Sequence, residues 1–192
     1  VEGMFIVAPS KFGAHNWDGI GEDVAHHALL SISRIMRKFK WLPQLDTNAI
    51  TVTGHSMGSH GALMNGTNHP HTTVCMGVYG PWITKESYGQ SNSFMGLDIQ
   101  SSQSLDSKLV YILDAALQDQ RPDAKLDSLN GVPALIRVGA QDMVTPVWHA
   151  RRLYRRMLEE GVNASLSEVT GKQHWWWDTD VPNDGGVLND KQ

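Results

Sequence analysis

The chain has 192 residues, enough for one domain with a sizeable core, and its 41% hydrophobic content argues against disorder. A net charge of −4 gives no reason to expect nucleic acid or an anionic membrane as partner, and no apolar run is long enough to span a membrane.

Cys75 is the only cysteine and is expected to be a buried, inert thiol. The first residue is not Met and no signal peptide pattern follows, so the sequence looks cut from a longer chain or processed, and it leaves the localisation undecided.

Strand-like and helix-like segments alternate along the chain. Short apolar runs predict strands, and apolar residues at helical spacing predict helices. In chain order we expect a strand at 4–8, a helix at 23–40, a strand at 49–53, a helix at 59–65, strands at 74–79 and 133–138, a helix at 147–160 and a strand at 165–169.

This alternation predicts an α/β fold: a three-layer α/β/α domain over residues 1–192, with a mainly parallel sheet of about five strands. Residues 80–131 break the alternation, because they are rich in Ser, Gln, Gly and Asn and contain one helical piece around 107–118. We expect this segment to be an insertion, or cap, over the carboxyl edge of the sheet.

The motif Gly54-His55-Ser56-Met57-Gly58 lies between a predicted strand and a predicted helix. In that setting a Gly-x-Ser-x-Gly string predicts a sharp turn that presents the serine hydroxyl as a nucleophile. We expect side chains at both glycines to collide with neighbouring backbone. The alternative is a structural serine in an ordinary strand–helix turn.

A serine nucleophile needs a base, and the base needs an orienting acid. Asp142 follows the strand at 133–138, and His174 follows the strand at 165–169, so the order Ser, acid, His is complete. Asp142 could instead cap the helix that follows it, and Asp178 and Asp180 are rival acids. The pair His69-x-His71 is a weak metal pattern, and we predict neither a metal nor another cofactor.

These motifs resemble those of the α/β-hydrolase superfamily, and within it the catalytic domain of prolyl oligopeptidase-like peptidases and related esterases. The elbow at 54–58, the turn from Gly139 to Asp142 and the loop histidine His174 carry the resemblance, and residues 17–24 are similar to the segment before the elbow. The resemblance covers most of the chain, from Met4 to about Trp177. The resemblance implies a serine hydrolase with Ser56, Asp142 and His174 as its triad.

The chain departs from that family because the three strands that usually precede the equivalent of 4–8 are absent from this sequence. Either the strand at 4–8 closes up against the elbow strand, or another chain fills the place that the absent strands leave in the sheet. An exposed sheet edge also makes a homodimer a further expectation. If the sheet closes up, the loop with Ser10, Lys11 and Phe12 lies beside the elbow. We then expect it to supply one oxyanion donor, with the Met57 N–H as the other.

Trp17, Trp82 and Trp175 follow predicted strands at the edge where the site is expected. Aromatic residues there suit an apolar acyl or aryl group, although core packing is the alternative. We therefore expect a small carboxylic ester as substrate. A prolyl oligopeptidase-like peptidase is the second hypothesis, and a non-catalytic fragment that serves as a binding module is the third.

Overall fold

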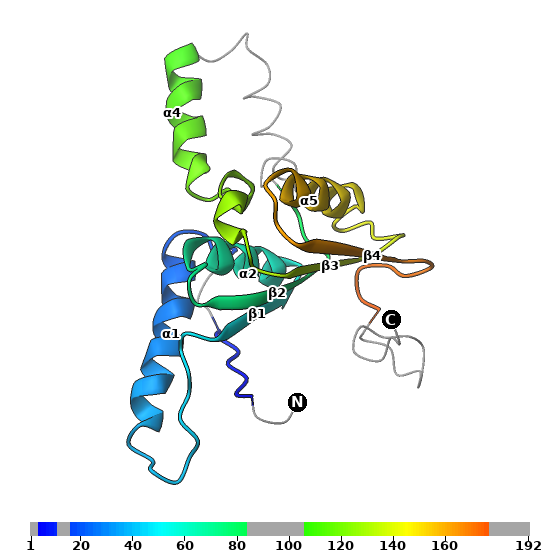
Figure 1. Cartoon of the computed structure of the whole chain (residues 1–192). Helices are drawn as coiled ribbons and strands as arrows, with labels where there is room; N and C mark the ends of the chain where they lie inside the picture. Colours follow the sequence, from blue (N-terminus) through cyan, green and yellow to red (C-terminus); the bar gives the residue numbers. More distant parts are fainter. Residues whose placement is uncertain (1–3, 11–15, 84–105, 177–192) are drawn as a thin grey trace.

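The computed structural model describes residues 4–10, 16–83 and 106–176 (Figure 1). Its four strands pair in chain order, and every neighbouring pair is parallel. They are β1 (Ile50–His55), β2 (Thr73–Tyr79), β3 (Ala134–Gly139) and β4 (Ala164–Val169). The mainly parallel α/β fold predicted from the sequence is confirmed.

The helices of the described chain follow the same alternation. They are α1 (Ile20–Met36), α2 (Met57–Asn68), α4 (Ser107–Gln118) and α5 (Trp148–Glu159), with short 3₁₀ turns at Pro122–Ala124 and Leu126–Leu129. Gly161, with a φ of 78°, ends α5, as its position after the last helical residue predicts. None of the helices in these ranges is long and apolar enough to cross a membrane.

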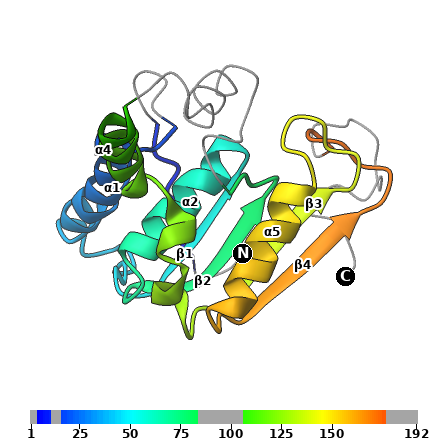
Figure 2. The same cartoon turned by 90° about the horizontal axis from the view of Figure 1, so that it is seen from above.

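Strand order decides where the helices lie. Parallel strands that pair in chain order through right-handed crossovers place every connecting helix on the same face. Accordingly, α2 and α5 lie on one face of the sheet (Figures 1 and 2). The described residues form no helix over the opposite face, where Thr51, Thr53, Leu135 and Ser165 are exposed, so they make two of the three expected layers.

The core lies between the sheet and these two helices. Strand residues that alternate toward α2 and α5 are buried, as the period-2 geometry of a strand requires. The buried set includes Val52, Met76, Val78, Ala134, Ile136 and Val138 from the strands and Leu63, Leu153 and Met157 from the helices. Leu126 and Leu129 join the same core, so the end of the predicted insertion belongs to the body of the domain.

The predicted strand at 4–8 does not form, and that expectation is wrong. Residues 4–10 have no regular structure, and Met4, Phe5 and Ile6 are 54%, 41% and 86% exposed. An apolar run becomes a strand only where a neighbouring strand takes its hydrogen bonds and another layer covers it. Among the described residues no strand pairs with this segment, so it does not close up against β1.

Helix α1 docks through a buried carboxylate. Glu22 is 5% exposed and lies 3.0 Å from His69 Nε2, while its side chain accepts a hydrogen bond from Asn65 Nδ2 at 2.9 Å. The ring of His26 stacks on that of His69 with centroids 3.7 Å apart. These polar contacts with the C-terminal end of α2 fix how α1 lies.

Candidate active site

The motif around Ser56 forms the expected sharp turn. β1 ends at His55, α2 begins at Met57, and Ser56 between them has φ 54° and ψ −117°, a conformation that non-glycine residues rarely adopt. A Cβ at Gly54 would collide with the carbonyl group of Gly58. A Cβ at Gly58 would meet nothing within 4 Å, so the steric expectation is right for Gly54 and wrong for Gly58.

The predicted acid and base meet at the same edge of the sheet. The Nδ1 of His174 donates to Oδ2 of Asp142 at 2.7 Å, and both side chains are buried. The loops that carry them are joined by backbone, because the Gln141 N–H donates to the carbonyl of Lys172 at 2.9 Å. This backbone hydrogen bond holds together Asp142 and His174, which are 32 positions apart in the sequence.

Three further hydrogen bonds fix the carboxylate of Asp142. Its Oδ1 accepts from the backbone N–H groups of Val144 at 2.9 Å and Thr145 at 2.8 Å, and its Oδ2 accepts from the Thr145 hydroxyl at 2.9 Å. Thr145 Oγ1 also lies 3.2 Å from Nδ1 of His174. Thr145 is fully buried and is not among the residues predicted for the site, although a Thr three residues after an Asp is a recognisable side-chain turn pattern.

These contacts set the charge of the acid. Burial alone would raise the pKa of the Asp142 carboxyl, but the hydrogen bonds from His174 and Thr145 together hold that pKa below its ordinary value. Asp142 is therefore ionised near neutral pH and can only accept hydrogen bonds. The proton of the neutral imidazole is consequently held on Nδ1, and Nε2 carries the lone pair that a base requires.

No family model matches the chain, but individual proteins do. An uncharacterized secreted protein of Arthroderma benhamiae is 22% identical over 175 residues, 90% of this chain and 18% of that protein. A puromycin-hydrolyzing peptidase of Mycobacterium tuberculosis has a TM-score of 0.60 at 15% identity, over 83% of this chain and 22% of its own. A monoacylglycerol lipase of Paleococcus ferrophilus has a TM-score of 0.54 at 17% identity, over 82% of this chain and 68% of its own.

The chain has an α/β-hydrolase fold. Porphyromonas gingivalis dipeptidyl peptidase 4 is a further structural neighbour, with a TM-score of 0.60 at 15% identity over 83% of this chain and 20% of its own. The chain spans about a fifth of the length of the secreted relative and of both peptidases.

In this α/β-hydrolase fold, His55 connects the elbow to the acid–base pair. Its ring centroid lies 4.5 Å from that of His174, so the imidazole of His174 lies against the residue that precedes Ser56. Burial, and next the neighbouring His174, lower the pKa of His55 to about 4, which keeps His55 neutral near pH 7. This ring contact cannot be predicted from the sequence, because it depends on how two distant loops meet.

Gly80, directly after β2, lies beside His174, Thr145 and His55. It has a φ of 55°, and a Cβ there would approach His174 Cε1 and Thr145 Oγ1 at 3.2 Å and His55 Nε2 at 3.3 Å. A side chain would be strained by the backbone and crowded by three residues of the site. Only glycine lets β2 end this close to His174.

The three aromatic residues predicted to bind substrate have different environments. Trp175 is 56% exposed, and its ring is perpendicular to that of His174 with centroids 4.9 Å apart, so it lies at the surface beside His174. Trp82 is 1% exposed and stacks on His60 with centroids 5.0 Å apart. This burial corrects the expectation that Trp82 lines the substrate surface. Trp17 is half-buried, and its indole fills the space beside Gly61 of α2.

A second Asp–His pair, Asp18 and His60, is connected to the turn at Ser56. His60 Nε2 and Asp18 Oδ1 are 2.8 Å apart, and His60 is 1% exposed. The backbone N–H of His60 donates to the carbonyl of Ser56 at 3.2 Å. This pair ties the turn before α1 to the first turns of α2, and sequence spacing alone gives no sign of it.

The predicted oxyanion donors are only partly within the described residues. Met57 is the first residue of α2, where N–H groups have no acceptor within the helix, so its N–H suits an anion. Ser10 is exposed and outside any strand or helix, and Lys11 and Phe12 lie outside the described residues. The described ranges contain no group of three or more His, Cys, Asp or Glu side chains suited to a metal ion.

Proposed function

We propose that this chain is a serine hydrolase that cleaves carboxylic esters through an acyl-enzyme formed on Ser56. The observation that carries the proposal is the buried Asp142–His174 hydrogen bond of 2.7 Å, with the His174 ring against the residue preceding Ser56. An ionised acid, an oriented imidazole and a serine on a strained strand–helix turn are the parts that acyl transfer requires.

The reaction has two stages. His174 Nε2 takes the Ser56 hydroxyl proton as the oxygen attacks the carbonyl carbon of the ester, and the Met57 N–H donates to the developing oxyanion. His174 then gives its proton to the leaving alkoxide, and the carbon–oxygen bond of the ester breaks. Water, deprotonated by His174, attacks the acyl-enzyme; the acyl–oxygen bond breaks, the acid leaves, and His174 returns the proton to the Ser56 oxygen.

Peptide bond cleavage is the second candidate, and the similarity to two peptidases at a TM-score of 0.60 supports it. We favour esters because an alkoxide leaves more readily than an amine. The test compares turnover of a p-nitrophenyl acyl ester with that of a peptide anilide, using Ser56→Ala as the control. Faster cleavage of the ester, lost in Ser56→Ala, is the expected result; faster cleavage of the anilide would assign a peptidase.

A further inference from the structure

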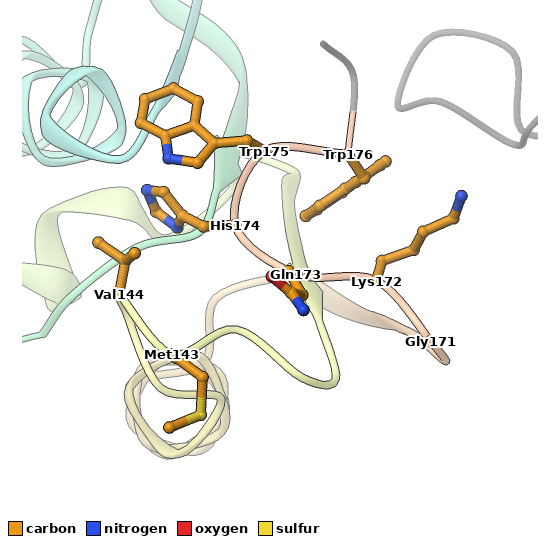
Figure 3. A pocket seen from close by; sticks show the side chains of 8 residues that line it. All are labelled: Met143, Val144, Gly171, Lys172, Gln173, His174, Trp175 and Trp176. Atoms are coloured by element: carbon orange, nitrogen blue, oxygen red, sulfur yellow. The ribbon is translucent and has the colours of Figure 1, made fainter. Parts of the chain in front are cut away.

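A hollow of about 380 Å³ adjoins His174 on the side of the loop that follows Asp142 (Figure 3). Two loops form its walls, one after β3 and one after β4. Its lining residues come from 143–144 and 171–176. It is therefore built from the same two loops that bring the acid and the base together.

The part of this hollow next to the imidazole is apolar. Figure 3 shows the ring of His174 between the side chains of Val144 and Trp175. Val144 is 45% exposed and Trp175 is 56% exposed, so both present apolar surface to solvent beside the ring. Lys172 also lines the hollow, but Figure 3 shows its side chain pointing away from His174.

The proposed reaction requires the leaving group of the ester to approach the imidazole of His174. The histidine that deprotonates the nucleophile later protonates the leaving group, so the leaving oxygen reaches hydrogen-bond distance of the imidazole. The rest of the leaving group then lies beside that ring. Among the described residues, the surfaces on either side of the ring are an isopropyl group and an indole.

We propose that Val144 and Trp175 form the subsite for the alcohol part of the ester, and that this alcohol is apolar, either aryl or alkyl. This inference rests on the proposed function and names its substrate class. Trp175 contributes a flat apolar surface and Val144 contributes methyl groups on the opposite side of the ring. Of the described residues, Asp142 is the acid beside this ring, and it is buried and already hydrogen-bonded, so it offers no counter-ion to a cationic alcohol.

The test separates binding of the alcohol from turnover. Binding of 2-naphthol to the full chain carrying Ser56→Ala, followed by ligand-observed NMR, should weaken about tenfold when Trp175→Ala is added, the scale of losing one aromatic contact. In the chain with Ser56 intact, the ratio of kcat/KM for 2-naphthyl acetate to that for acetylcholine should fall in Trp175→Ala and in Val144→Asp. Trp41→Ala is the matched control, because Trp41 is 78% exposed on the connection after α1.

The outcomes distinguish the two proposals. Ester turnover with naphthol binding unaffected by Trp175→Ala would overturn the subsite and leave the esterase proposal standing. Trp175-dependent naphthol binding without turnover of any ester would support the subsite and overturn the catalytic proposal. Absence of naphthol binding to the Ser56→Ala chain would also overturn the subsite.

Discussion

The Nδ1 of His174 lies 2.7 Å from Oδ2 of Asp142, inside the protein and at the carboxyl edge of a parallel sheet. Replacement of Asp142 by Asn puts an amide in place of an acceptor that is always ionised near neutral pH. The amide can donate to Nδ1 and thereby favour the imidazole tautomer that lacks a lone pair on Nε2. We expect Asp142→Asn to lower kcat for an ester substrate by a factor on the order of 10⁴.

Asp178 is the matched control for that change, since it is a rival acid in the sequence. Asp178→Asn should retain most of the rate. A large loss from Asp178→Asn, with activity kept in Asp142→Asn, would reassign the acid.

The Thr145 hydroxyl stabilises the charged form of Asp142 from a fully buried position. Thr145→Val keeps the shape of the side chain and removes the donor, leaving a buried carboxylate oxygen with one hydrogen bond fewer. We expect the free energy of unfolding at neutral pH to fall by about 1.5–3 kcal/mol, measured by urea denaturation. Thr145→Ser should restore most of it, and equal stabilities for Val and Ser would show that the hydroxyl contributes nothing.

Gly54 and Gly58 bracket the elbow, and the structure predicts opposite responses to the same change. A methyl group at Gly54 would collide with the backbone of Gly58, which cannot move without breaking the turn. Gly54→Ala should therefore abolish ester turnover and lower the melting temperature. Gly58→Ala meets open space in the first turn of α2, so it should change stability by no more than about 1 kcal/mol. Equal tolerance of both substitutions would contradict the described turn.

His55 makes stability depend on pH. Its pKa is lowered to about 4 in the folded protein from an ordinary value of 6.5, so between these values the unfolded chain binds more protons. The contribution of His55 is therefore complete above about pH 6.5 and decreases as the pH falls toward 4. His55→Phe keeps an aromatic ring and removes the titrating group. Urea unfolding across this pH range should show a shallower loss of stability in the variant, and equal slopes would contradict the burial of a neutral His55.

The sequence predicted those parts of the molecule that depend on local pattern. The strands from β1 onward and the helices α2, α4 and α5 follow from apolar runs and helical spacing, because buried parallel strands have continuous apolar sequences. The turn at Ser56 and the contact between Asp142 and His174 follow from residue order along those strands. This order determines which loops share the carboxyl edge of the sheet.

What the sequence did not predict depends on contacts between distant residues. The segment 4–8 has a strand-like composition, but no strand beside it accepts its hydrogen bonds. Apolar spacing also does not show how α1 lies, because Val24 and Ile35 of this helix are exposed whereas the charged Glu22 is buried where the helix meets α2. Trp82 follows a strand as the expected rim residue does, but stacking on His60 holds it inside.

The most direct measurement is a reaction of the folded full chain with an aryl phosphonate, with the modified residue located by peptide mass spectrometry. Our account predicts a single adduct on Ser56, absent in Ser56→Ala and formed far more slowly in His174→Ala. A folded chain that gives no adduct at Ser56 would contradict a catalytic serine and would favour a binding module with this fold.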